Sequence, residues 1–286
     1  MQQYLNGLKF ILENGVDKPN RTGVDTRGVF GLQMRYNLGD GFPAVTTKKL
    51  AFNTMKAELL WFISGSSDVR ELQKNGCHIW DANAEADYWK PKARFEGDLG
   101  RVYGVQWRHW QKLDLPNRQA GGGEVDQLAN LIENIKKAKA DPTISSARRL
   151  ILTAWNPGEL DQMALPPCHM FYQFYVEGET LSLQMYQRSC DMFLGVPFNI
   201  ASSSLLLSLI AQVTGLIPKD FVHALGDAHI YHNHFDAVGE QLTRTPHQLP
   251  KLWLNPKIKD INQFTMDDIK LVDYEYDPPI KAAMAV

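Results

Sequence analysis

The first third of the chain contains one strand-like and one helix-like pattern of apolar residues. Four apolar residues occupy alternate positions: Phe30, Leu32, Met34 and Tyr36. This alternation predicts a strand with one buried face. Between residues 52 and 63, apolar residues follow helical spacing instead: Phe52, Met55, Leu59 and Phe62. This spacing predicts a helix, and Gly65 is placed to end it.

The remainder of the chain predicts two more helices and a hairpin. Residues 125–135 carry apolar side chains at helical spacing, and Asp141-Pro142 follows. Segments 169–176 and 181–188 alternate as strands around the turn Glu177-Gly178-Glu179. The apolar run 200–213 is too long for a typical strand, so we expect a buried helix. Helices mixed with a hairpin predict an α+β fold with a mixed sheet.

The chain of 286 residues is expected to form a single domain, 1–286, because it shows no repeat and no low-complexity linker. One polar stretch, 112–124, ends in Gly121-Gly122-Gly123 and is expected to be a surface insertion. No apolar run approaches the ~20 residues of a membrane span. The N-terminus lacks the basic start and apolar stretch of a signal peptide, so a cytoplasmic location is expected.

Charge and cysteine content narrow the function classes. The formal net charge is -2, which argues against an electrostatic polynucleotide surface and leaves small anionic ligands open. The three cysteines are an odd number without metal-type spacing, so neither a disulfide framework nor a cysteine metal site is expected. A thiol that stays reduced can serve as a nucleophile.

Cys168 is the candidate nucleophile. It follows Pro166-Pro167 directly before a predicted strand, and the two prolines restrict the backbone that leads to it. A thiol at a strand end beside a cation is held partly as thiolate. A lone cysteine is more often a small core residue, so its position alone does not decide its role.

Arginines supply the cation and candidate anion sites. Pairing within the hairpin brings Arg188 near Cys168, where it would favour the thiolate and bind a phosphate; a solvated strand arginine is the alternative. Arg148-Arg149 precedes an apolar run and forms either an anion site or a pair of surface charges. Arg21 lies in a turn-rich loop that suits phosphate binding and equally suits any polar loop.

Two further features suggest chemistry. Glu58 lies on the apolar face of the 52–63 helix, where a buried carboxylate serves either acid–base chemistry or an ion pair. The run 229–234 contains three histidines that do not share one helix face, so sugar recognition by His229 and Tyr231 is favoured over a metal site. The chain lacks GxGxxG, GxxxxGK[ST] and GxSxG, so dinucleotide, P-loop and serine-hydrolase functions lose their usual support.

Taken together, these segments resemble the folate-dependent thymidylate synthases nearly end to end. The most specific stretch is 165–201. It contains Pro167-Cys168-His169, Gln187-Arg188-Ser189-Cys190-Asp191 and Pro197-Phe198-Asn199-Ile200-Ala201. Other matching segments precede it: Phe42-Pro43, Thr46-Thr47-Lys48, Glu58-Leu59-Leu60-Trp61-Phe62, Gly97-Asp98-Leu99-Gly100 and Val102-Tyr103-Gly104.

The resemblance implies a homodimer joined through its sheets, and it assigns the binding residues. The expected dUMP ligands are Arg21, Arg188, Ser189, Asp191, Asn199, His229 and Tyr231, with Arg148 and Arg149 reaching in from the partner subunit. The expected folate contacts are Ile79, Trp80, Asp191, Phe198 and the C-terminal Val286. No metal is expected.

The resemblance also implies a methyltransferase mechanism. Cys168 would add to C6 of the uracil ring, so that C5 gains carbanion character. Asn199 would read the uracil edge, Tyr103 or a water would take the C5 proton, and Glu58 would manage protons on the folate. The cosubstrate 5,10-methylenetetrahydrofolate would supply both the one-carbon unit and the hydride, giving dTMP and dihydrofolate.

Some residues depart from the family pattern, and two alternatives stay open. Arg101 stands where many members have proline, and Ala51 where many have histidine. Leu225 and Ala228 alter the segment before the sugar-binding histidine. One alternative is a pyrimidine nucleotide hydroxymethylase, whose cytosine-specific members carry aspartate where Asn199 stands. The other is a catalytically silent nucleotide- or RNA-binding protein.

Overall fold

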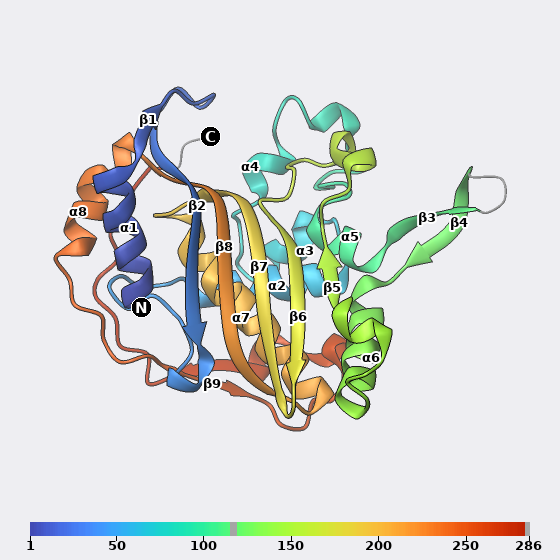
Figure 1. Ribbon diagram of the computed structural model, residues 1–286. Helices are drawn as coiled ribbons and strands as arrows, with labels where there is room; N and C mark the ends of the chain where they lie inside the picture. Colours follow the sequence, from blue (N-terminus) through green and yellow to red (C-terminus); the bar gives the residue numbers. More distant parts are fainter. Residues whose placement is uncertain (115–118, 284–286) are drawn as a thin grey trace.

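A six-stranded mixed sheet forms the centre of the computed structural model, which describes residues 1–114 and 119–283 (Figure 1). The strand order is β1-β2-β8-β7-β6-β5, and every neighbouring pair is antiparallel except β7 and β8, which are parallel. The strands are β1 Val16–Lys18, β2 Thr26–Asn37, β5 Ile151–Thr153, β6 His169–Glu177, β7 Thr180–Asp191 and β8 Ile217–Tyr231. The predicted α+β class with a mixed sheet is confirmed.

The predicted hairpin forms between β6 and β7, with Gly178 at a φ of +56° in the turn. Its pairing ends at His169 opposite Gln187, so Cys168 lies directly beyond the hairpin's open end. Because β7 and β8 are parallel, their C-terminal ends reach the same edge of the sheet, where Asp191 pairs with His229. This topology gathers polar residues from three strands at one edge.

The predicted buried helix is α7, Gly195–Thr214, which lies behind the sheet in Figure 1. Gly215 ends it in the left-handed conformation that glycine adopts readily. By length and composition α7 is apolar enough to cross a membrane, with a mean hydropathy of 1.5, so the expectation that no run approaches that length was wrong. However, 78% of this stretch is buried within the protein, as a core helix would be.

The other helices surround the sheet. The predicted 52–63 helix is α2, Phe52–Ser64, and Gly65 caps it as expected, at a φ of +77°. The helix predicted from residue 125 is α6, which begins later because Asp126 caps it through the amide of Ala129. The further helices are α1 Gln2–Asn14, α3 Val69–Gln73, α4 Asp81–Ala84, α5 Tyr103–Arg108, α6 Gln127–Ala140 and α8 Phe235–Leu242.

Short 3-10 turns and two small sheets complete the described chain. The 3-10 turns are η1 Leu38–Asp40, η2 Lys90–Lys92, η3 Ser145–Arg148, η4 Pro157–Gln162, η5 His232–His234, η6 Ile261–Gln263 and η7 Met266–Asp268. One small sheet pairs β9, Lys251–Leu254, with β10, Ile269–Val272. The other pairs β3, Trp110–Asp114, with β4, Gln119–Val125, and projects from the body in Figure 1. In its described residues, the stretch expected to be a surface insertion is therefore a projecting hairpin.

The alternation predicted for residues 30–36 holds only in part. Met34 and Tyr36 are buried, but the side chain of Phe30 is 83% exposed. Gly31 beside it has a φ of +82°, so the regular pleat is interrupted there. The face of the sheet opposite α7 also carries the exposed Tyr175 and Gln173 of β6. This face therefore presents some of its side chains to solvent.

Candidate active site

One cavity of about 880 Å³ gathers nearly all of the predicted site residues. They come from the sheet edge, from the first turns of α7, and from α2, α5 and two loops. The predicted residues that line it are Arg21, Glu58, Ile79, Trp80, Tyr103, Cys168, Arg188, Ser189, Asp191, Phe198, Asn199, His229 and Tyr231. Segments far apart in the sequence thus converge on one site.

The thiol of Cys168 is half-buried in this cavity, and its environment pulls its pKa in two directions. Burial raises the pKa of the thiol above its usual value. The nearby guanidinium of Arg188, the hydroxyl of Tyr103 and the charge of Arg21 each lower it. Arg188 thus favours the thiolate as expected, but burial outweighs it in the ligand-free chain, so the net pKa shift is upward and a partly formed thiolate is not supported there.

Arg188 is fixed beside Cys168 as the hairpin predicted. Its backbone N–H donates to the carbonyl of Cys168 at 2.9 Å. Its guanidinium donates to the carbonyls of Pro167 and Pro166 at 2.8 and 3.0 Å and lies 5.4 Å from the ring centre of Trp155. The two prolines therefore position both the cysteine and the arginine beside it.

Glu58 is buried on α2, with the residue 8% exposed. Burial raises the pKa of its carboxyl to about 7, although a hydrogen bond from Trp80 works in the opposite direction. That bond runs from the indole N–H of Trp80 to Oε1 at 2.7 Å. A carboxyl poised near neutral pH beside a nucleophile suits proton transfer in either direction.

Tyr103 links Glu58's helix to the nucleophile. It begins α5, and its ring stacks on Phe62 of α2 with 4.7 Å between ring centres. Its φ of +22° is unusual for a residue with a side chain, and such strain is concentrated at functional sites. Its hydroxyl accepts the backbone N–H of Cys168 at 2.7 Å, and burial raises the pKa of that hydroxyl well above its usual value.

Asn199 is held by a chain of amide hydrogen bonds. The side-chain amide nitrogen of Gln187 donates to Oδ1 of Asn199 at 2.9 Å. The side-chain oxygen of Gln187 lies 2.9 Å from Nε2 of His223, which is buried, and burial lowers the pKa of this histidine to about 3. A neutral histidine can donate through Nε2 to the side-chain oxygen of Gln187, which directs the amide nitrogen of Gln187 toward Oδ1 of Asn199. The amide nitrogen of Asn199 is then free to donate into the cavity.

The rest of the 229–234 run divides between the cavity and its surroundings. His229 and Tyr231 line the cavity, with their rings 5.3 Å apart. His232 instead lies 3.0 Å from a carboxylate oxygen of Asp17, and buried His234 contacts the carbonyl of Ala283 at 2.7 Å. Within residues 1–114 and 119–283, no three His, Cys, Asp or Glu side chains form a metal-type group.

One wall of the cavity is apolar. Ile79, 40% exposed, lies beside Trp80 before α4, while Phe198 projects from the first turn of α7. Asp191 receives the backbone N–H groups of Phe193 and Leu194 at 2.9 and 3.1 Å, which fixes its carboxylate at this end of the helix. An apolar wall with one fixed carboxylate fits a flat heteroaromatic ring that carries N–H donors.

Two of the predicted residues that the structure describes do not line the cavity. Arg148 and Arg149 lie at and just after η3 on the surface, where the guanidinium of Arg149 donates to the hydroxyl of Ser145 at 2.7 Å. Val286 falls outside the described residues. The expectation that the two arginines serve a partner subunit's site therefore stays a prediction.

Sequence reasoning gave no role to several polar residues of the site, among them His169 and Gln187. His169 lines the cavity, and its Nδ1 lies 2.6 Å from the hydroxyl of Tyr172. Burial lowers the pKa of His169 to about 3. His169 and Gln187 are polar residues that pair at the open end of an otherwise largely apolar hairpin. This position beside Cys168 could have indicated that they belong to the site.

A comparison with protein families agrees with this geometry. The family described as "Thymidylate synthase" has a model that matches residues 2–286, nearly the whole chain. The match covers every element that contributes to the cavity, from the Arg21 loop to the end of β8. The chain therefore belongs to the thymidylate synthase family.

Proposed function

We propose that this protein converts dUMP to dTMP, with 5,10-methylenetetrahydrofolate as cosubstrate and dihydrofolate as the second product. One observation carries the proposal: a cysteine, a buried carboxyl, a fixed asparagine and an arginine share one cavity, at Cys168, Glu58, Asn199 and Arg188. These are the groups that addition to a uracil ring, proton transfer and phosphate binding require.

Each residue has a task that its surroundings support. The thiol of Cys168 adds to C6 of the pyrimidine as it loses its proton, and the nearby guanidinium of Arg188 favours the charged form. The free amide nitrogen of Asn199 donates to O4, so negative charge that develops on this oxygen is stabilised. A water bound to the hydroxyl of Tyr103 receives the proton from C5, because burial keeps that hydroxyl itself protonated.

The nucleotide's phosphate is proposed to lie at the arginine end of the cavity, against Arg21, Arg188 and Ser189. The sugar then meets His229 and Tyr231 at the end of β8. Charge-assisted hydrogen bonds from arginine match a phosphate well, so this end fixes the nucleotide's direction. The base is then directed toward Cys168 and Asn199.

The apolar wall of Ile79, Trp80 and Phe198 is proposed to hold the folate ring, with Asp191 accepting from its N–H groups. When bound, this cosubstrate supplies the one-carbon unit and the hydride. Glu58 faces the same wall through its bond to Trp80, and with its pKa near 7 it holds or releases a proton there.

A spectrophotometric assay tests the reaction. Purified protein with dUMP and 5,10-methylenetetrahydrofolate should produce dihydrofolate, seen as rising near-ultraviolet absorbance. Consumption of the folate without dihydrofolate would indicate a dUMP hydroxymethylase instead. No consumption by folded protein would contradict both reactions. Cys168→Ser should nearly abolish turnover and leave dUMP binding measurable.

We also propose that two copies pair through the exposed sheet face, so that Arg148 and Arg149 bind the nucleotide's phosphate in the partner's cavity. Their surface position outside the chain's own cavity supports this arrangement. Complementation between subunits tests it. Arg149→Glu protein and Cys168→Ser protein should each be nearly inactive, and their mixture should recover activity because hybrid dimers contain one intact site. A mixture that stays inactive despite subunit exchange would contradict the proposal.

A further inference from the structure

Arg101, one of the departures from the family pattern, forms a shielded ion pair outside the cavity. Its Nε donates to Oε2 of Glu159 at 2.5 Å, and the two side chains are 16% and 12% exposed. The same carboxylate oxygen accepts the side-chain amide of Gln106 at 2.7 Å. The guanidinium also donates to the carbonyl of His109 at 2.6 Å. A shielded pair with its remaining hydrogen bonds satisfied is strongly disturbed when one partner is removed.

The pair joins two segments that both lead into the active site. We call residues 155–167 the cysteine loop, because it leads directly to Cys168, and residues 98–109 the tyrosine segment, because it contains Tyr103. Backbone bonds also join them: Arg101 N–H donates to the carbonyl of Gln162 at 2.8 Å, and Ala164 N–H donates to that of Leu99 at 3.0 Å.

Gly100 shows how closely the two segments approach. Its φ is +71°, and a Cβ at this position would lie 2.2 Å from the carbonyl oxygen of Gln162 and 2.5 Å from the ring of Trp89. Only glycine fits such a contact without displacing the backbone. The tyrosine segment and the cysteine loop are thus in direct backbone contact next to the ion pair.

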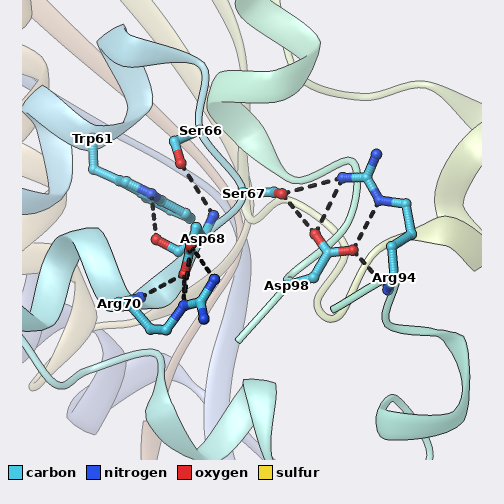
Figure 2. A network of polar contacts seen from close by, with 7 residues as sticks. All are labelled: Trp61, Ser66, Ser67, Asp68, Arg70, Arg94 and Asp98. Atoms are coloured by element: carbon cyan, nitrogen blue, oxygen red, sulfur yellow. Dashed lines mark hydrogen bonds and ion pairs between the residues drawn. The ribbon is translucent and has the colours of Figure 1, made fainter. Parts of the chain in front are cut away.

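The tyrosine segment is itself anchored to the body of the protein, as Figure 2 shows. Asp98 is buried and accepts hydrogen bonds from the hydroxyl of Ser67 at 2.6 Å and from Nε of Arg94 at 2.9 Å. It also accepts the backbone N–H of Gly100 at 3.0 Å. With this end fixed, the Arg101–Glu159 pair connects the cysteine loop to a rigid support.

The two segments meet again at the nucleophile, where the hydroxyl of Tyr103 accepts the N–H of Cys168. We propose that the Arg101–Glu159 ion pair is a positioning device that holds the cysteine loop against the tyrosine segment, and thereby keeps the Cys168 thiol aligned for attack on the bound nucleotide. The catalytic part of this inference rests on the proposed function; the loop-holding part does not.

Two variants test the inference against a matched control. Arg101→Met and Glu159→Gln each remove the charge pair. Arg108→Met removes another arginine of the same segment, also 16% exposed, whose partner Asp126 lies outside the cysteine loop. Arg101→Met and Glu159→Gln should lower kcat at least tenfold. They should change the Kd for dUMP by a clearly smaller factor, because Arg21, Ser189 and Asn199 lie on other elements and only Arg188 is held by this loop. Arg101→Lys, which keeps the charge, should recover most of kcat.

Hydrogen–deuterium exchange separates this inference from the proposed reaction, because it needs no turnover. The peptide over residues 160–165, which contains the bonded amide of Ala164, should exchange at least tenfold faster in Arg101→Met and Glu159→Gln than in wild type. Arg108→Met should leave this peptide unchanged. Exchange that matches the control, or an undiminished kcat in an enzyme that makes dihydrofolate, would overturn the positioning role.

Discussion

The hydroxyl of Tyr103 accepts the backbone N–H of Cys168 at 2.7 Å, so the nucleophile and the candidate base are joined by one hydrogen bond. As an acceptor in this bond, the tyrosine keeps its own O–H available for a second partner in the cavity. A side-chain hydrogen bond from the same hydroxyl lowers the pKa of the Cys168 thiol, which burial raises. The oxygen of Tyr103 therefore holds the backbone of Cys168, and its hydroxyl proton is available to the thiol or to a water in the cavity.

Tyr103→Phe should therefore lower kcat by about 10²–10⁴-fold, the usual loss when an acid–base group is removed. It should also raise the apparent pKa of Cys168 in the ligand-free protein, measured from the pH dependence of alkylation at that residue. Tyr36→Phe is the control, because its buried hydroxyl contacts the sulfur of Met34 and lies outside the cavity lining. Equal losses in the two variants would mean that Tyr103 acts only through stability.

Glu58 gives a pH dependence whose sign follows from its burial. Its pKa is raised to about 7 in the folded chain, so it favours folding fully below its ordinary pKa of 4.5 and loses this contribution as the pH rises through 7. Glu58→Gln should thus gain stability relative to wild type between pH 5 and pH 8, by at most about 3 kcal/mol. Thermal unfolding at the two pH values measures this. If the difference in stability between Glu58→Gln and wild type is the same at pH 5 and pH 8, the raised pKa of Glu58 is contradicted.

Trp80→Phe provides a second test of the same carboxyl. Loss of the indole donor should raise the pKa of Glu58 further, so the matching inflection in the pH profile of turnover should move to higher pH. Trp61→Phe is the matched control, because that indole donates to the carbonyl of Asp68 instead. If both variants shift the inflection equally, the bond to Trp80 is not its cause.

The ionised carboxylate of Asp98 should stabilise the fold, and this contribution should disappear at low pH. Burial works to raise its pKa, but hydrogen bonds from Arg94 and Ser67 outweigh this and lower it to about 2. Asp98→Ala leaves these donors without their acceptor, so we expect a loss of about 1–3 kcal/mol in urea unfolding at pH 6. Because the folded pKa is depressed, wild type should lose this advantage as the pH falls from about 3.8 toward 2.

Asp68→Ala is a useful comparison, since Figure 2 shows a second carboxylate with arginine contacts close by. Asp68 caps α3 and pairs with Arg70, whose side chain is 52% exposed. Its removal should cost about 1 kcal/mol, as for an ordinary helix cap. A loss as large as that of Asp98→Ala would argue against the special role of the buried network.

Much of this architecture was predictable because it depends on local spacing. The hairpin followed from alternation around Glu177-Gly178-Glu179, and the face occupied by Glu58 followed from helical spacing. Arg188 was placed near Cys168 because hairpin register is a local property. The identity of the remaining cavity residues came from the family resemblance, not from spacing.

Other features depend on contacts between distant segments and were missed. Phe30 has the spacing of a buried residue, but which face of a strand is covered is decided by elements elsewhere in the chain. The β3–β4 hairpin contains glycine-rich sequence with low strand propensity. Gln187 gained a role only when β8 brought His223, 36 residues away, to its other side.

The bonds of Gln187 lead to a prediction about base specificity. Its amide nitrogen donates to Oδ1 of Asn199, so the asparagine presents its N–H group to the base, which suits the O4 acceptor of uracil. Gln187→Glu removes that donor, and the new carboxylate instead accepts from the asparagine's amide. Asn199 should then turn its oxygen to the base and accept from the amino group of cytosine.

We expect Gln187→Glu to raise the ratio of kcat/KM for dCMP to that for dUMP at least tenfold, since a donor–acceptor mismatch at a buried site is strongly discriminated against. Gln187→Met is the control, because it breaks the same bonds without offering an acceptor, so it should lower both values and leave their ratio nearly unchanged. Asn199→Asp tests the same idea at the next residue in the chain of bonds and should shift the ratio in the same direction. If neither charged variant changes the ratio, the orientation of Asn199 does not select the base.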